Sequence, residues 1–225
     1  MNEFLKSIVQ LPLSSNQYVN EVTPKFQIVL HHTAGNSSGV AVRNAWEHDK
    51  RGRIATCVII SGKGAKGTTD GEIIQCFSSR KWAYHLGVKT EVFKAHGLPW
   101  MNLDQIAIGI EICNWGWLEK GKDGKFRTYV GTIVDSSDVC ELETPFKGHK
   151  YWHNYTPAQI ESVKNLLIYW REIYGIPLKA DFDQLFSVNK KALRGENGLF
   201  THNSYRRDKS DIYPHPGLLE MLFSL

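Results

Sequence analysis

Three segments of the chain place metal-binding or proton-transferring side chains at the ends of apolar runs. The first is LHHT, the second is GIEIC and the third is THNSYRRDKSD. Their candidate side chains are His31, Glu111, His202, Lys209 and Asp211. Two histidines and one carboxylate are the ligand set of a catalytic zinc site that keeps one position open for water. A nearby glutamate would act as general base and a nearby lysine would stabilise an oxyanion, so the set predicts a metal-dependent hydrolase.

Each of these residues also has an ordinary structural interpretation. A histidine after a strand is often structural, a glutamate in an apolar strand can lie at an edge or pair with an arginine, and RRDKSD is typical of a solvated loop. Taken together these interpretations weaken, because a charge in a buried strand is costly unless it is paired or coordinated. No H-E-x-x-H helix is present, which excludes the common zinc-protease arrangement. The spacing alone leaves the hydrolase and the structural interpretation open.

Short apolar runs and amphipathic segments must position these side chains. The β-rich runs predict strands over 26–32, 56–61, 72–77, 106–113, 128–134 and 197–202. The segments with helical spacing of apolar residues predict helices over 37–50, 157–174 and 217–223. The Gly-rich segment GKGAKGTTDG is expected to close a hairpin, and GKDGK a turn. Interleaved strands and helices favour an α/β layer architecture.

Two local patterns sharpen this prediction. Adjacent residues on a strand point to opposite faces, so at most one of His31 and His32 can face a shared pocket. In the longest helix, Thr156 is the expected N-cap, Gln159 completes a capping box and Gly175 ends the helix.

The length of 225 residues and the 42% hydrophobic content indicate one globular domain, 1–225, that needs no disulfide to fold. Residues 116–154 are charged and Gly-rich, and we interpret them as an excursion inserted into that domain. The four cysteines show no C-x-x-C spacing, so we expect reduced thiols and no zinc ribbon. The net charge of +4 suits an acidic polymer as partner, and no nucleic-acid partner is expected.

No apolar run approaches the roughly 20 residues that cross a bilayer, so no membrane span is expected. The first residues, MNEFLKSIVQLPLSS, carry one lysine and a short broken apolar stretch, with no convincing cleavage site. This pattern argues against a secretory signal peptide and predicts synthesis in the cytoplasm.

The motifs as a set resemble those of the zinc-dependent N-acetylmuramoyl-L-alanine amidases of type 2. This family includes phage endolysins, bacterial autolysins and peptidoglycan recognition proteins. The matching stretches follow the family order and are IVLHHTAG, ATCVII with DGEIIQ, WAYHLG, QIAIGIEIC and THNSYRRDKSD. The resemblance implies an α/β fold with a central mixed β-sheet flanked by helices, and a zinc ion in a groove on one side.

The resemblance also implies a role for each matched residue. His31, His202 and Asp211 would be the ligands of one Zn2+ ion. Glu111 falls on the acidic residue that activates the attacking water. Lys209 matches the basic residue that stabilises the tetrahedral intermediate.

Four further residues receive an expectation from the same comparison of motifs. His85, in WAYHLG, is expected to line the substrate groove. His32 is expected to pack or to support the site rather than to bind metal, and His215, in YPHP, is the alternative third ligand. Thr56 stands where some phage members carry a catalytic tyrosine, and those members lack the glutamate of the strand.

The implied reaction is hydrolysis of the amide bond between N-acetylmuramic acid and L-alanine, with peptidoglycan or muropeptides as substrate and lysis of the cell wall as outcome. Two alternatives stay open. One is a cytosolic amidase that recycles soluble anhydro-muropeptides, and the other is a non-catalytic peptidoglycan-binding module. We expect a monomer, which as a phage endolysin would reach the wall through a holin-type pore.

Overall fold

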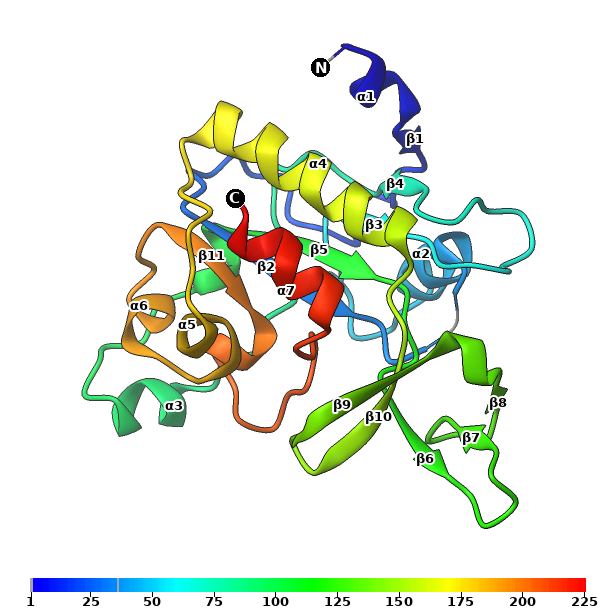
Figure 1. The fold of residues 1–225 in the computed structure, drawn as a ribbon. Helices are drawn as coiled ribbons and strands as arrows, with labels where there is room; N and C mark the ends of the chain where they lie inside the picture. Colours follow the sequence, from blue (N-terminus) through cyan, green and yellow to red (C-terminus); the bar gives the residue numbers. More distant parts are fainter. Residues whose placement is uncertain (1, 36) are drawn as a thin grey trace.

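The computed structural model describes residues 2–35 and 37–225 and has a six-stranded mixed β-sheet at its centre (Figure 1). In spatial order the strands are β1 (Val9–Gln10), β4 (Ile73–Gln75), β3 (Val58–Ile60), β5 (Ala107–Ile112), β2 (Gln27–His32) and β11 (Gly198–Thr201). All neighbouring strands run parallel except β3 and β4, which form the predicted hairpin. The predicted α/β fold with a central mixed sheet is confirmed.

The two central strands are apolar along most of their length because both faces of the sheet are covered. All six residues of β2 are buried, and β5 has five buried residues and the half-buried Glu111. Such nearly continuous apolar runs are typical of parallel strands with helices on both faces. The two strands therefore form in the middle of the fold and carry His31, His32 and Glu111 near their carboxyl ends.

Helices cover the two faces of the sheet with two separate hydrophobic clusters. On one face α4 (Pro157–Tyr174) and α7 (Pro216–Phe223) pack over β2 and β5, as Figure 1 shows. On the other face α3 (Thr90–Ala95) and α6 (Lys190–Leu193) pack against Val29 and Ala107. The remaining helical elements are α1 (Asn2–Ser7), α2 (Gly39–Glu47), α5 (Phe182–Phe186) and the 3-10 turns η1 (Leu103–Gln105), η2 (Ser136–Asp138) and η3 (His202–Ser204).

The ends of α4 follow the local signals of the sequence. The Thr156 side chain accepts a hydrogen bond from the Gln159 amide, and the Gln159 side chain accepts one from the Thr156 amide, which completes the capping box. Gly175 ends the helix with a φ of 67°, a left-handed conformation that favours glycine. The predicted helix over 157–174 is confirmed in full.

Residues 117–153, within the segment predicted to be an inserted excursion, form a second sheet of five antiparallel strands (Figure 1). The strands are β6 (Trp117–Lys120), β7 (Phe126–Arg127), β8 (Ile133–Val134), β9 (Val139–Phe146) and β10 (His149–His153). GKDGK forms the predicted turn between β6 and β7. The strand predicted over 128–134 is confirmed only at its end, where Ile133–Val134 form β8. Before β8 the chain turns: Thr128 donates to and accepts from Thr132, and Gly131 adopts a φ of 83° there.

The four cysteines are free, and three of them are buried. Across the described residues, no helix combines the length and the apolar character that crossing a membrane would require.

Candidate metal centre

The carboxyl ends of three parallel strands bring the predicted site residues to one edge of the central sheet. His31 is the fifth residue of β2 and lies directly opposite Glu111 of β5. His202 follows immediately after β11, whose last residue, Thr201, is paired with Leu30 of β2. Residues far apart in the sequence become neighbours because parallel strands end at the same edge, where α/β folds place their ligands.

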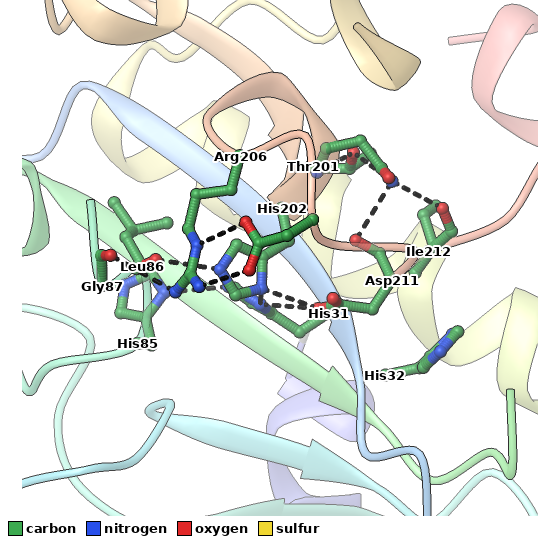
Figure 2. Close-up of polar contacts among 12 residues, drawn as sticks. His31, His32, His85, Leu86, Gly87, Thr201, His202, Arg206, Asp211 and Ile212 are labelled. Carbon is green, nitrogen blue, oxygen red and sulfur yellow. Dashed lines mark hydrogen bonds and ion pairs between the residues drawn. The ribbon is translucent and has the colours of Figure 1, made fainter. Parts of the chain in front are cut away.

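The alternation of side chains along β2 separates the two adjacent histidines. His31 points to the same side as Glu111, whereas His32 stands apart from the cluster in Figure 2. The Nδ1 atom of His32 lies 2.8 Å from the hydroxyl of Tyr155 on the α4 side of the sheet. Burial lowers the pKa of His32 to about 4, so the ring is neutral at neutral pH.

His31, His202 and Asp211 form a cluster whose spacing matches a metal site (Figure 2). The two Nδ1 atoms of the histidines are 3.1 Å apart. The Oδ2 atom of Asp211 lies 3.2 Å from His31 Nδ1 and 2.9 Å from His202 Nδ1. Tetrahedral zinc with bonds of about 2.0–2.1 Å holds its ligand atoms roughly 3.3 Å apart. The spacing of the three side chains therefore fits three ligands of one zinc ion, and all three residues line one cavity.

The protonation of these ligands suits a metal. Burial lowers the pKa of His31 to about 4, which leaves the ring neutral. Burial also favours the neutral form of Asp211, but its contacts with His202 and His31 outweigh this effect and hold the pKa of this carboxyl well below its usual value. Neutral imidazoles and an ionised carboxylate are the forms that bind a metal.

A backbone carbonyl fixes which nitrogen His202 offers. Its Nε2 atom lies 2.9 Å from the carbonyl oxygen of Leu86, and a carbonyl only accepts, so Nε2 carries the proton. The nitrogen left for a metal is therefore Nδ1, the atom that faces His31 and Asp211.

Asn203 holds the segment that carries Asp211. Its side-chain nitrogen donates to the carbonyl oxygens of Asp211 at 3.2 Å and of Ile212 at 2.7 Å. These two hydrogen bonds hold the ends of the polar loop 202–211 together. The carboxylate of Asp211 therefore lies next to the ring of His202. The sequence contains no signal for this role, since an asparagine after a histidine is equally common in a solvated turn.

Glu111 and Lys209 line one cavity of about 380 Å³ together with the metal cluster. Burial raises the pKa of the Glu111 carboxyl well above its usual value, the charge of Asp211 raises it further, and Lys209 opposes the rise. A carboxylate with a raised pKa is suited to exchange protons near neutral pH. The cavity thus holds an acid–base group and a cation beside three potential metal ligands.

The other residues singled out in the sequence, His85, His215 and Thr56, lie outside the metal cluster. His85 borders the same cavity, but its side chain is only 6% exposed and its Nδ1 atom lies 2.9 Å from Nε2 of His31. His215 is not brought to the cluster: its Nδ1 accepts from the Leu218 amide at the start of α7, and its Nε2 lies 2.6 Å from the Asn154 side chain. Thr56 lines the cavity, and its hydroxyl donates to the Val58 carbonyl.

Comparison with known proteins gives a family for this arrangement. The model of the Amidase_2 family, described as N-acetylmuramoyl-L-alanine amidase, matches residues 23–216. No protein among the curated sequences matches the chain.

Several solved structures are similar in fold. The crystal structure of a Se-Met AmpD derivative has a TM-score of 0.50 and 14% sequence identity, and the match covers 97% of this chain and 93% of that one. PlyL has a TM-score of 0.49 at 13% identity, covering 95% and 89% of the two chains. The amidase LysC from Clostridium intestinale URNW has a TM-score of 0.47 at 14% identity, covering 95% and 93%. At 14% identity and a TM-score of 0.50, the likeness to the AmpD derivative concerns the fold alone.

Proposed function

The chain belongs to the family of type 2 N-acetylmuramoyl-L-alanine amidases, and from this premise we propose that it is a zinc-dependent hydrolase of the amide bond between N-acetylmuramic acid and L-alanine in peptidoglycan. The observation that carries the proposal is the cluster of His31, His202 and Asp211 next to Glu111 and Lys209 in one cavity. A non-catalytic binding module would not need a metal triad together with a buried base.

His31, His202 and Asp211 would hold the zinc ion through two nitrogens and one oxygen. Bound there, zinc would supply Lewis acidity, which polarises the scissile carbonyl and makes water a stronger acid.

The protein groups around the cluster would handle the protons and the developing charge. Glu111, in its ionised form, takes a proton from the attacking water and later transfers it to the nitrogen of the departing L-alanine amine. Lys209 lies on the loop next to Asp211 and directs its ammonium charge to the oxygen that becomes negative in the tetrahedral intermediate. The residues that line the rest of the cavity, including His85, would contact the substrate around the scissile bond.

The direct test is release of muropeptides from purified sacculi. We expect zinc-loaded protein to release soluble fragments and to expose new amino groups on L-alanine. Failure of the zinc-loaded protein to release either product would refute the proposal.

Glu111→Gln provides the residue-level test of the same mechanism. The variant keeps the size and the polarity of the side chain but cannot accept a proton, so the rate should fall by roughly 10²- to 10⁴-fold. Zinc content, measured by elemental analysis, should stay at the wild-type level. A variant that lost zinc along with activity would show that Glu111 supports metal binding rather than proton transfer.

The choice of substrate separates cell-wall lysis from recycling. We propose lysis, by a phage endolysin or a bacterial lytic enzyme, because the net charge of +4 suits an anionic wall polymer. Intact sacculi and soluble anhydro-muropeptides should be compared at equal bond concentration. Activity on the soluble fragments alone would assign the chain to the recycling of muropeptides in the cytosol.

A further inference from the structure

One loop contacts both histidines of the metal cluster through their outer ring nitrogens. This loop, residues 84–87, follows Ala83 and precedes α3. The Nδ1 atom of His85 lies 2.9 Å from Nε2 of His31, and the carbonyl oxygen of Leu86 lies 2.9 Å from Nε2 of His202. Figure 2 shows His85 and Leu86 side by side next to the two ligands. The Nε2 atoms of His31 and His202, the ring nitrogens that point away from the cluster, therefore contact two consecutive residues of this loop.

The direction of the contact between His31 and His85 follows from the cluster. His31 turns its Nδ1 atom to His202 and Asp211. A metal bound among the three would need the lone pair of Nδ1, which leaves the ring proton of His31 on Nε2. His31 Nε2 then donates to His85 Nδ1. His85 consequently carries its own proton on Nε2, a buried atom that has no hydrogen-bond partner within the described part of the chain.

Asp104 fixes the backbone of the 84–87 loop. Its carboxylate oxygen Oδ1 accepts hydrogen bonds from the amides of His85 at 2.8 Å and Leu86 at 2.9 Å. The same oxygen lies 3.9 Å from Nε2 of His85, which is the protonated nitrogen. Asp104 is only 7% exposed, so its negative charge is little screened by water.

The neighbouring strand leaves room for this arrangement. A Cβ atom added to Gly109 of β5 would lie 3.2 Å from Nδ1 of His85 and 2.6 Å from Cγ2 of Thr56. The imidazole of His85 is thus packed on the backbone of the strand that also carries Glu111, and it has little freedom to turn away from His31.

We propose that His85 is a positioning residue for the metal: it accepts the proton of His31 Nε2, fixes His31 as an Nδ1 ligand, and is itself held by the carboxylate of Asp104. This inference rests on the proposed metal site, and its test does not depend on amidase activity. Outer partners of this kind raise the basicity of a ligand histidine and orient its ring, and losing one typically weakens metal binding by roughly 10- to 100-fold.

Zinc affinity of His85 variants tests the proposal. His85→Phe fills the same space without an accepting nitrogen and should bind zinc roughly 10- to 100-fold more weakly in competition with a chelator. His85→Gln retains an accepting oxygen and should recover most of the affinity. His48→Phe is the matched control, because His48 is exposed on the surface at the end of α2 and should leave the affinity unchanged.

A spectroscopic readout distinguishes positioning from a general loss of structure. In the cobalt-substituted protein, the visible absorption of the metal should shift in His85→Phe and stay close to the wild type in His85→Gln. If His85→Phe does not fold, His85→Met, whose flexible side chain fills the space without an accepting nitrogen, takes its place.

Wild-type affinity and an unchanged cobalt spectrum in a folded His85→Phe or His85→Met would overturn the proposal. So would an affinity in His85→Gln as low as that in His85→Phe, because acceptance of the proton would then not matter. Absence of zinc binding by the wild-type protein would instead refute the metal site itself, so the two failures are distinguishable.

Discussion

At the scale of single residues, burial shifts the pKa values of several side chains in and around the site. Burial keeps His31 and His32 neutral, with the pKa of each lowered to about 4, and burial also raises the pKa of Glu111. Their partners then decide the outcome: His31 meets Asp211 and His202, whereas His32 meets the hydroxyl of Tyr155. A neutral imidazole becomes a ligand only where other ligand atoms lie within reach.

The raised pKa of Glu111 predicts a cost in stability for the metal-free protein. Because the folded state binds this proton more tightly than the unfolded state, the contribution to stability is present below the unfolded pKa and is lost as pH rises through the folded pKa. Metal-free Glu111→Gln should therefore unfold at a higher temperature than metal-free wild type near neutral pH, and the difference should shrink toward about pH 4.

Thermal unfolding of the two proteins across this pH range measures the effect. Glu119→Gln, on the exposed part of β6, serves as control and should leave the pH dependence unchanged. Equal unfolding temperatures of Glu111→Gln and wild type at neutral pH would contradict a strongly desolvated carboxyl.

At the scale of elements, the close packing of β5 against its neighbours lets the site assemble. β5 carries Glu111 toward the cavity, while Gly109, two residues earlier on the same face, lets Thr56 and His85 approach its backbone. The second sheet also contacts the polar loop 202–211: Lys147, in the turn between β9 and β10, donates to the carbonyl of Arg207 at 2.8 Å. The polar loop 202–211 is thus supported from the central sheet and from the second sheet.

Gly109→Ala tests the packing of β5. The added methyl group would lie 2.6 Å from Cγ2 of Thr56, so one of the two must shift, at a cost of about 1–3 kcal/mol in the free energy of unfolding. Urea denaturation measures the change, and zinc affinity should fall as well because the methyl group presses on His85.

The double variant Gly109→Ala with Thr56→Ser is the control, since it removes the methyl group that clashes. It should recover part of the lost stability. An unchanged denaturation midpoint in Gly109→Ala alone would show that β5 and Thr56 separate more easily than the contact distance indicates.

At the scale of the whole molecule, neutral histidines are built into both faces of the sheet. Burial lowers the pKa of His31, His32 and His215 from 6.5 to about 4. Between these two values the unfolded chain binds more protons than the folded one, so stability is fully present above the unfolded pKa and is lost as pH falls toward the folded pKa. Asp211, whose pKa is lowered, acts in the same direction at lower pH.

The protein should therefore lose stability steadily as pH falls from 6.5 toward 4. Excess zinc should raise the unfolding temperature near neutral pH, with about 2.7 kcal/mol gained when free zinc is 100 times its dissociation constant. This gain should disappear over the same acidic range, because protons compete with the metal for the ligands. Unfolding temperatures measured with zinc and with a chelator check both statements, and a flat pH profile would contradict them.

Local patterns were sufficient to predict most of the central fold. The strands predicted over 26–32 and 106–113 became β2 and β5, and the capping box at Thr156 became the start of α4. The second sheet was not foreseen, because β7 and β8 have only two residues each and half of β9 is exposed, so its apolar pattern is weak.

The sequence by itself determined which side chains could serve the site and that His31 and His32 must face opposite ways, since the period of a strand is a local property. Only the tertiary structure decided that His31 meets Asp211, 180 residues further along the chain, at 3.2 Å. It also decided that Asp104 and the 84–87 loop stand behind the ligands. Such contacts depend on the order of strands in the sheet and on the paths of loops, which no short stretch of sequence specifies.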